Sequence, residues 1–235
     1  MTENIKALIV NLWFIVFGGK GGLHELKSKT AILIKSDVTE NDCEKIKKKI
    51  NDIIENRFSL VWSDEEGADK RIFEFEKYYN GLCELLKIDE KIRSIELYTG
   101  RKIESWTIMA NMISHKNNNK GSGGGWHKDS AFSHQVKYIW YLTNVNEENG
   151  PFQFIKNTNK IKKYGDNQIS ATRFQNITEN EKIESVLGSA GDLLICDTSC
   201  VHRGKPIDQG VRYAITLYTF NTKSAKNKML KEVYF

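Results

Sequence analysis

The sequence has no hydrophobic run long enough to cross a membrane. The best candidate, residues 7–17, is interrupted by Asn11, whereas a transmembrane helix needs about 20 apolar residues. The run also lacks the basic start and the small-residue cleavage site of a secretory signal peptide. We expect this segment to pack on the hydrophobic core. The alternative is a helix lying on a membrane surface, and Trp13, Phe14 and Phe17 keep that alternative open.

Cysteine is scarce, and no Cys-x-x-Cys pair occurs. The four cysteines are Cys43, Cys83, Cys196 and Cys200, and their spacing supports neither a zinc ribbon nor a thioredoxin-type motif. The apolar run that ends at Cys196 predicts a strand, so we do not expect Cys196 and Cys200 to share a helix face. Buried or half-buried free thiols are expected, as is usual in a reducing compartment such as the cytoplasm.

The chain has only a small excess of charge of one sign. Its 35 Lys and Arg residues and 30 Asp and Glu residues leave a formal net charge of +5. The basic stretch at residues 45–49 raises the alternative of a nucleic-acid binder or nucleic-acid oxygenase. The sequence shows no interleaving of aromatic and basic residues that would line a path for a strand. A Lys-rich solvated surface with no nucleic-acid partner is therefore the expectation.

Length and patterning predict a single domain over residues 1–235. The 235 residues are ample for a hydrophobic core. We expect a mainly helical part at residues 1–100 and a C-terminal tail at 223–235. In the first part, Thr30–Lys35 predicts a strand, and isoleucines at helical spacing predict a helix that Ser36 or Asp37 caps and that ends near Asn56. A second helix is expected over residues 71–86.

The pattern changes after residue 100, where short strand-like runs are separated by polar or glycine-rich stretches. The runs are residues 104–113, 136–145, 152–155, 192–197 and 212–220. This order predicts an α+β chain whose residues 101–222 form a β-sandwich or jelly roll. Residues 157–184 are polar with few apolar anchors, so a mobile loop or lid is expected there.

One pair of residues carries metal-binding chemistry. His127 and Asp129 lie in the sequence Trp-His-Lys-Asp-Ser, and on an extended strand they point to the same face. An imidazole and a carboxylate with a third ligand from a distant segment make a facial triad, the pattern of non-haem iron(II) oxygenases. The pair alone is weak evidence, but it follows the glycine-rich residues 121–125, where a loop enters a strand. His202 is the candidate for the third ligand.

A second constellation begins ten residues beyond His202. Arg212 opens a run of alternating character in which Arg212 and Thr216 share one face. A buried arginine needs an anion, and its planar fork suits a carboxylate held through two hydrogen bonds. The alternative is an exposed arginine on an edge strand.

Three blocks of the sequence together resemble the phytanoyl-CoA dioxygenase family. The blocks are residues 121–130, residues 141–152 with their Glu-Asn-Gly turn, and residues 191–197 followed by His202 and Arg212. The resemblance covers roughly residues 109–220. It implies a double-stranded β-helix core of the jelly-roll or cupin type, with the N-terminal helices packed on it, in an enzyme that depends on iron(II), 2-oxoglutarate and O2.

The resemblance also implies roles for individual residues. His127, Asp129 and His202 would bind iron, and Arg212 would pair with the far carboxylate of 2-oxoglutarate. Thr216 could add a hydrogen bond. Further polar contacts to the cosubstrate are expected from the strand before Val145, with Tyr141 as the first candidate and Lys137 as the second.

The expected reaction is the hydroxylation of a small or conjugated metabolite, with release of succinate and CO2. Asp129 fills the position that is a small residue in related halogenating enzymes, which favours oxidation over halogenation. The Pro-Gly-Ser-His segment of the family is replaced here by residues 156–160, so the substrate is not fixed. Arg203 and Lys205 either meet a carboxylate, phosphate or sugar acid of the substrate or are simply exposed. Together with the apolar N-terminal run, they are compatible with an anionic, glycan-linked or lipid-linked substrate. A non-catalytic jelly-roll binding protein is the competing hypothesis.

Overall fold

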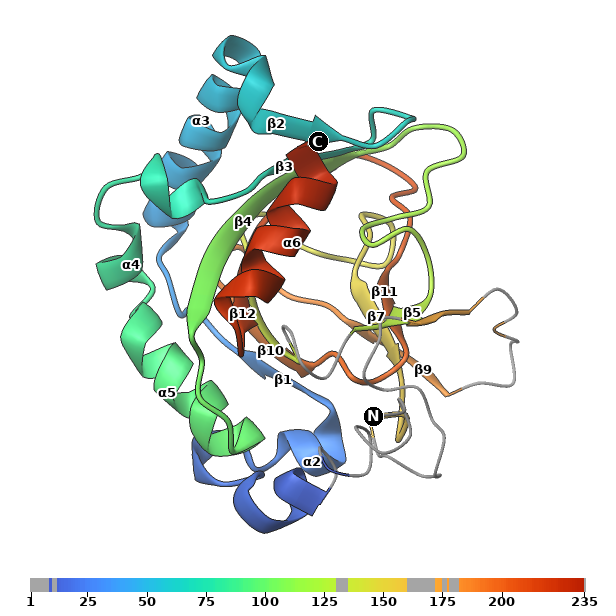
Figure 1. Cartoon of the computed structure of the whole chain (residues 1–235). Coiled ribbons are helices and arrows are strands. Elements are labelled where there is room, and N and C mark those ends of the chain that lie inside the picture. Colours follow the sequence, from blue (N-terminus) through green and yellow to red (C-terminus); the bar gives the residue numbers. More distant parts are fainter. Residues whose placement is uncertain are drawn as a thin grey trace.

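Two antiparallel β-sheets form the centre of the structure, a computed structural model (Figure 1). It describes residue 9, residues 12–129, 135–159, 172–174 and 177, and residues 182–234. The large sheet has the order β1 (Ala31–Ile34), β10 (Leu193–Asp197), β6 (Val136–Tyr141), β12 (Val211–Phe220), β4 (Ser105–Ser114), β3 (Asp69–Ile72) and β2 (Val61–Ser63). The small sheet has the order β8 (Thr172–Arg173), β5 (His127–Lys128), β11 (His202–Gly204), β7 (Phe152–Ile155) and β9 (Ile183–Val186).

Helices cover the outer face of the large sheet (Figure 1). They are α3 (Glu40–Asn56), α4 (Leu82–Leu85) and α5 (Ile88–Thr99), with α2 (Leu26–Lys29) and the 3-10 turns η1 (Gly21–Leu23), η2 (Phe58–Leu60) and η3 (Phe75–Lys77). Alternation along β4 separates the two faces of the sheet. Ile108 and Ala110 join the core under the helices, whereas Met109 and Asn111 line a cavity on the inner face. The predicted α+β class with a jelly-roll core is confirmed.

The expected helix after the first strand is present as α3. Ile46, Ile50 and Ile53 are fully buried on the face that the spacing predicted. Its cap, however, is Thr39, whose hydroxyl accepts a hydrogen bond from the backbone N–H of Asp42 at 3.1 Å. The prediction that Ser36 or Asp37 caps this helix is wrong. The Asp37 carboxylate instead accepts a hydrogen bond from Trp140 at 2.7 Å.

The prediction of one long helix over residues 71–86 is wrong. The chain there completes strand β3, makes the turn η3 and enters α4 only after Gly81, which has φ +77°. Phe75, Leu82 and Leu86 are fully buried, so the apolar spacing reflects core packing by three short elements. The strands β2 and β3 and the helix α5 were not expected from the sequence.

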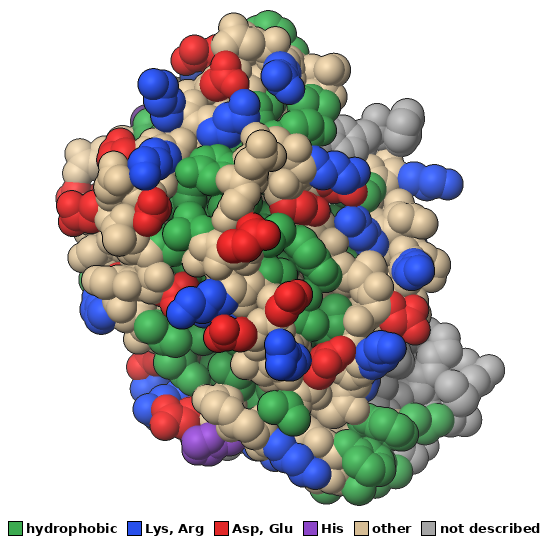
Figure 2. Space-filling model, turned by 90° about the vertical axis from the view of Figure 1, so that its left-hand side faces the viewer, with side chains coloured by type: hydrophobic (Ala, Val, Ile, Leu, Met, Phe, Trp, Pro, Cys, Tyr) green, Lys and Arg blue, Asp and Glu red, His purple; other side chains and the backbone are tan. Residues whose placement is uncertain are grey.

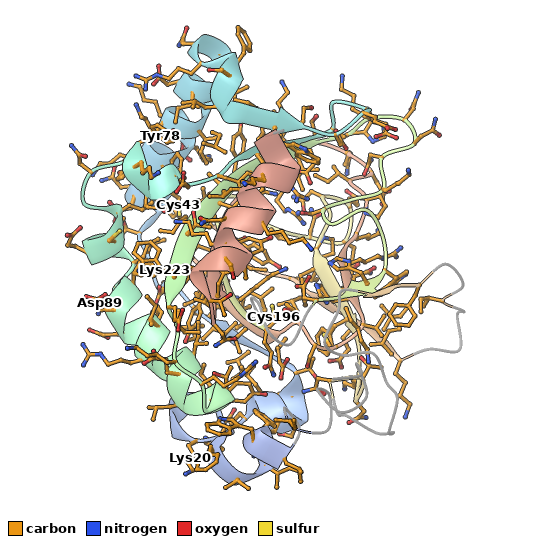
Figure 3. The ribbon with its side chains drawn as sticks, in the orientation of Figure 1. Lys20, Cys43, Tyr78, Asp89, Cys196 and Lys223 are labelled. Atoms are coloured by element: carbon orange, nitrogen blue, oxygen red, sulfur yellow. The ribbon has the colours of Figure 1, made fainter. Side chains whose placement is uncertain are left out.

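The N-terminal and C-terminal segments both differ from what the sequence predicted. The expected C-terminal tail forms α6 (Lys223–Tyr234), which begins at Lys223 (Figure 3) and contacts β4 and β12. Residues 12–17 are helical, and of them Phe14 packs against Tyr98 at 5.4 Å between ring centroids. Trp13, Ile15 and others remain exposed. Among the described residues, no helix combines the length and apolar character needed to cross a bilayer.

The sequence also led to expectations for the strands of the second half, for the cysteines and for residues 157–184. All five predicted runs in the second half contain strands, although β6 ends at Tyr141. The four cysteines are free, with Cys43 on α3 and Cys196 on β10 (Figure 3). Residues 157–184, expected to form a loop, contain β8 and the start of β9, and much of this range lies outside the described residues. On the helical face, basic and acidic side chains are interspersed (Figure 2).

Candidate metal centre

The two histidines of the predicted triad lie opposite each other in the small sheet. His127 on β5 is paired with His202 on β11, and their ring centroids are 4.3 Å apart. Asp129 follows β5 by one residue, and its backbone N–H donates to the carbonyl of Thr198 at 3.0 Å. Strand pairing therefore brings together residues that lie 75 positions apart in the sequence, and it directs their side chains to the same side.

The three side chains converge on one point. Oδ1 of Asp129 is 3.7 Å from Nε2 of His127, and Oδ2 is 3.4 Å from Nε2 of His202. One ligand atom from each residue lies within 4.8 Å of the other two. His202 and Asp129 are buried, and His127 is partly exposed. The three residues nominated from the sequence thus form a group with the composition of a facial triad.

Hydrogen bonds fix how the two imidazoles are oriented. Nδ1 of His127 is 2.8 Å from the carbonyl oxygen of Gly125, and Nδ1 of His202 is 3.0 Å from that of Cys200. A carbonyl can only accept, so each Nδ1 donates, and in the neutral ring the lone pair then lies on Nε2, which faces Asp129. Burial, with His202 adding to it, lowers the pKa of His127 to about 3. Two neutral imidazole nitrogens and one carboxylate are a donor set that fits iron(II).

The glycine-rich loop makes room for this centre. At Gly123, which has φ +85°, a Cβ atom would lie 2.4 Å from Cε1 of His127. At Gly121, φ is +73° and a Cβ atom would lie 2.0 Å from the carbonyl oxygen of Gly204. Only glycine avoids both the positive-φ penalty and these collisions. The loop can therefore lie directly against the ring of His127.

Lys137 on β6 lies beside the carboxylate of the triad. Its Nζ is 2.5 Å from Oδ2 of Asp129 and 4.8 Å from the ring centroid of Tyr218. Burial alone would lower the pKa of Lys137, but the negative charge of Asp129 outweighs it, and the net pKa is raised. The ammonium group therefore stays charged and orients Asp129. The sequence nominated Lys137 as a cosubstrate contact, and the structure gives it this nearer carboxylate partner.

Arg212 on β12 lines the same cavity as the triad, which has a volume of about 280 Å³. Its side chain is buried, and burial lowers its pKa. Among the described residues, its Nε atom has no hydrogen-bond partner. A buried guanidinium with an unsatisfied donor carries a free-energy penalty that an anionic ligand would remove. The alternative of an exposed edge-strand arginine is wrong, because β12 lies between β6 and β4.

Thr216 and Tyr141 also line this cavity. Thr216 lies four residues after Arg212 on β12, on the same face of the strand, and is buried. The hydroxyl of Tyr141 donates to the backbone carbonyl of Val186 at 2.9 Å. Burial raises the pKa of Tyr141, so this hydroxyl stays protonated. Of the two, Thr216 has the hydroxyl without a hydrogen-bond partner among the described residues.

Several cavity residues were not singled out from the sequence. They come from three elements outside the expected motifs: Arg71 and Phe73 from β3 and the residue after it, Met109 and Asn111 from β4, and Met229 from α6. The sequence Asp-Lys-Arg-Ile-Phe at residues 69–73 does not alternate between polar and apolar residues, so no local signal indicated a strand here.

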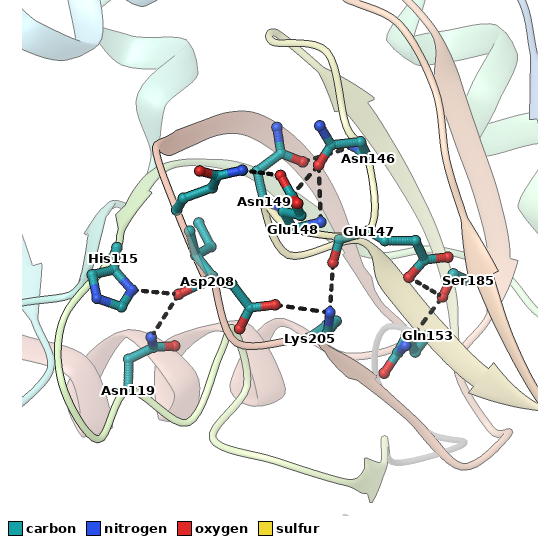
Figure 4. Close-up of polar contacts among 12 residues, drawn as sticks. His115, Asn119, Asn146, Glu147, Glu148, Asn149, Gln153, Ser185, Lys205 and Asp208 are labelled. Atoms are coloured by element: carbon teal, nitrogen blue, oxygen red, sulfur yellow. Dashed lines mark hydrogen bonds and ion pairs between the residues drawn. The ribbon is translucent and has the colours of Figure 1, made fainter.

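The two basic residues that flank His202 are engaged by protein groups. Arg203 donates to Gln153 at 2.9 Å and stacks over Trp126 at 4.4 Å from the ring centroid. Lys205 donates to the carbonyl of Glu147 at 2.6 Å and pairs with Asp208 at 3.0 Å (Figure 4). The contacts of Lys205 fasten the Glu-Asn-Gly turn to the loop after β11. These roles favour the structural interpretation of both residues over substrate binding.

The phytanoyl-CoA dioxygenase (PhyH) family model matches residues 31–209, which is more than half of the chain. The chain belongs to this family. The match confirms the resemblance inferred from the three sequence blocks and extends it to the N-terminal strand β1. No curated protein matches the sequence.

Solved structures with the same fold are similar over most of their length. The α-ketoglutarate-dependent epimerase SnoN from nogalamycin biosynthesis has a TM-score of 0.63 at 12% identity, with 84% of this chain and 81% of that chain covered. HygX from Streptomyces hygroscopicus, with nickel and 2-oxoglutarate bound, has a TM-score of 0.58 at 12% identity, with 86% of each chain covered. A prolyl-4-hydroxylase from Pseudomonas putida has a TM-score of 0.58 at 10% identity, with 84% and 96% covered.

Family membership and the donor set agree on the type of enzyme. The chain is an oxidoreductase of the iron- and 2-oxoglutarate-dependent type, and its cofactors are iron(II), 2-oxoglutarate and O2, as expected. The similar structures include an epimerase and a prolyl-4-hydroxylase. The fold is therefore compatible with more than one outcome of the oxidation.

Proposed function

We propose that this protein is a dioxygenase that hydroxylates a small or conjugated metabolite and converts 2-oxoglutarate into succinate and CO2. The observation that carries the proposal is the convergence of His127, Asp129 and His202 within 4.8 Å in the cavity that also contains the buried Arg212. A metal and a diacid can be held side by side only if both sets of ligands face the same space.

In this proposal the small sheet holds the iron. His127 and His202 supply Nε2, and Asp129 supplies a carboxylate oxygen. When bound, the iron supplies the redox chemistry that couples O2 to decarboxylation of the cosubstrate and oxidation of the substrate. The backbone carbonyls of Gly125 and Cys200 keep the imidazoles in the required tautomer, and Lys137 keeps Asp129 in place.

The large sheet holds the cosubstrate. Arg212 binds the carboxylate of 2-oxoglutarate that is remote from the metal, because that interaction satisfies the guanidinium in a buried place. Thr216 adds a hydrogen bond from the same strand. The buried apolar neighbours of the site, which include Phe152 and Met109, exclude water from the space where the reactive groups meet.

Hydroxylation is favoured over halogenation because the carboxylate of Asp129 is present at the triad. Some similar structures bind natural products: one is SnoN with nogalamycin RO and another is HygX with hygromycin B. A small-molecule substrate is therefore proposed here as well. Epimerisation remains a second candidate outcome because SnoN is described as an epimerase, and the isolated product distinguishes it from hydroxylation.

Succinate formation tests the proposal directly. Purified protein with iron(II), ascorbate and 2-oxoglutarate should form succinate slowly without substrate, and faster with the right member of a metabolite panel. His127→Ala should abolish both rates. His115→Ala is the matched control, since His115 is an exposed histidine whose ring contacts the carbonyl of Ile207, and it should behave as the wild type.

The competing hypothesis is a jelly-roll binding protein without turnover. It predicts that anaerobic calorimetry detects no iron(II) binding, or that iron and 2-oxoglutarate bind without succinate ever forming. Either result with folded wild-type protein would overturn the proposed activity.

A further inference from the structure

The cavity contains a second arginine, half-buried, that the proposed function does not use. Arg71 on β3 lines it together with the metal-binding residues and Arg212, and its side chain is 17% exposed. β3 belongs to the hairpin that β2 and β3 add to the edge of the large sheet. Arg71 therefore approaches the site from a segment outside the three motif blocks.

Arg71 is held rigidly from two sides. Its Nε donates to Oδ2 of Asp69 at 3.0 Å, and its Nη2 donates to the same oxygen. Its guanidinium carbon lies 4.9 Å from the ring centroid of Trp62. Nη2 also reaches the hydroxyl of Ser122 at the long distance of 3.4 Å. Among the described residues, Nη1 donates to no acceptor, so one end of a preorganised fork stays available to a ligand.

Asn111 lies next to Arg71 on the same face. The two residues are directly opposite in the β3–β4 register, and opposite residues of an antiparallel pair project to one side. Asn111 is 3% exposed and lines the cavity, and its Oδ1 has no hydrogen-bond partner among the described residues. The buried Oδ1 atom can only accept, so a hydroxyl or N–H group of a ligand would satisfy it, whereas the Nδ2 group of the same amide can donate to an oxyanion. Arg71 and Asn111 therefore offer several donors and one acceptor at one place.

The register leaves space beside this pair and separates it from Arg212. Asn111 is opposite Ala214 on β12, and the small Ala214 side chain leaves room above the sheet. Arg212 is opposite Ile113, which lies two residues after Asn111 on β4 and therefore on the same face of that strand. Arg71 and Arg212 are therefore neighbouring but distinct anchors on the floor of one cavity.

The charges of the site indicate what the second anchor binds. 2-Oxoglutarate has two carboxylates; one end chelates the metal and the other pairs with Arg212, so none is left for Arg71. Asp69 neutralises Arg71, and Asp129 neutralises Lys137. With iron(II) and 2-oxoglutarate bound, the cations Arg71, Lys137 and Arg212 and the carboxylates of Asp69 and Asp129 leave the loaded cavity with one net positive charge. An organic substrate with a single negative charge would remove it.

We propose that Arg71 and Asn111 bind an oxyanion group, a carboxylate or a phosphate, of the organic substrate. The proposal rests on the proposed function, because it assigns the substrate class of the same site. In it, Nη1 of Arg71 and Nδ2 of Asn111 donate hydrogen bonds to the anion, while Asp69 and Trp62 keep the guanidinium in place. The carbon atom that is oxidised then belongs to the same substrate molecule as the oxyanion and lies on the side of that molecule that faces the metal centre.

Calorimetry with anaerobic protein loaded with iron(II) and 2-oxoglutarate tests the site. The probes are pentanoate, butyl phosphate and butylamine, which share a butyl chain and differ in the head group. Pentanoate or butyl phosphate should bind and butylamine should not, and the stronger of the two anions identifies the oxyanion. Arg71→Gln should weaken that anion about tenfold or more, the usual effect of losing a hydrogen bond between charged groups.

Two further variants separate the alternatives. Lys70→Gln removes one positive charge from the same strand, next to Arg71 but on the other face by strand alternation, and it should change anion affinity less than about twofold. Asp69→Asn/Arg71→Gln removes both charges of the buried pair, which avoids leaving a lone buried carboxylate, and it should lose anion binding with the fold intact.

Four results would overturn the proposal. They are no binding of either anion to the wild type, unchanged binding in Arg71→Gln, equal losses in Arg71→Gln and Lys70→Gln, and loss of 2-oxoglutarate binding in Arg71→Gln. The last would make Arg71 a cosubstrate or loop-positioning residue. Failure of the wild type to bind iron(II) and 2-oxoglutarate is seen before any probe is added, so failure of the proposed function is recognised separately.

Discussion

The two sheets contribute different chemistry to one cavity. The small sheet supplies the imidazoles of His127 and His202 from strands of two and three residues, with Asp129 immediately after the first. The large sheet supplies the cations Arg71, Lys137 and Arg212 from strands of four, six and ten residues. The direct pairing of His127 with His202 places the two imidazole rings side by side over a very short length of strand.

The residues of the two sheets should therefore respond differently to substitution. The donors of the small sheet depend on each other and on backbone carbonyls, so one displaced residue disturbs the whole centre. Arg71 and Arg212 lie on separate strands of the large sheet and away from the triad, so each can be removed with a confined effect, whereas Lys137 is paired with Asp129. Variants of the two sheets should therefore separate metal binding from anion binding.

The largest effect is expected where the two sheets meet, at Asp129. Asp129→Ala should abolish iron(II) binding and also lower the free energy of unfolding by about 3–5 kcal/mol, because the buried ammonium of Lys137 loses its counter-charge. Iron(II) titration and denaturant unfolding measure the two effects. The double variant Asp129→Ala/Lys137→Met should regain most of the stability without regaining iron binding. A double variant as unstable as the single one would show that the ion pair does not connect the sheets as described.

Arg212→Lys should weaken the binding of 2-oxoglutarate by the large sheet without weakening iron(II) binding by the small sheet. The substitution keeps the charge but loses the planar fork, so affinity for 2-oxoglutarate should fall about tenfold to a hundredfold. Iron(II) affinity in the absence of 2-oxoglutarate should stay within about threefold of the wild type. Arg203→Lys is the control, because Arg203 contacts Gln153 and Trp126 and does not line the cavity. An equal loss in both variants would contradict the assignment of Arg212.

Gly123→Ala should weaken the binding of iron(II) by the small sheet. The added methyl group would lie 2.4 Å from the ring of His127, so iron(II) affinity should fall about tenfold. At Gly81, which also has positive φ, a Cβ atom meets nothing within 4 Å. Gly81→Ala should therefore cost only the backbone strain, about 1–2 kcal/mol in the free energy of unfolding. Equal iron affinities in the two variants would mean that the loop does not position His127.

The smallest effect is expected for Tyr141→Phe. The hydroxyl of Tyr141 donates to Val186, so its loss should reduce the free energy of unfolding by about 1 kcal/mol. Affinity for 2-oxoglutarate should change less than about threefold, and less than in Thr216→Val, where the removed hydroxyl faces the cavity. A tenfold loss in Tyr141→Phe would instead support the cosubstrate contact that the sequence suggested.

Local sequence patterns predicted much of this architecture. The strands β4, β6, β7, β10 and β12, the helix α3 and the candidate triad could be recognised because alternation, helical spacing and the order of motifs are local signals. The short strands β8, β9 and β11 were not predicted. The hairpin β2–β3 and the cavity residue Arg71 could not be recognised, because their strand character depends on pairing with β4. The helix predicted over residues 71–86 failed for the same reason: periodic burial arose from three short elements in one core.

By itself, the sequence determined the type of chemistry. His127, Asp129, His202 and Arg212, in that order and after a glycine-rich loop, are sufficient to predict an iron- and 2-oxoglutarate-dependent centre. Only the tertiary structure decided which other charges share the cavity: Lys137 lies against Asp129, and Arg71 is brought in from the sheet edge. The physical reason is that ligand chemistry is a property of side chains, whereas which charges meet is set by strand register between distant segments.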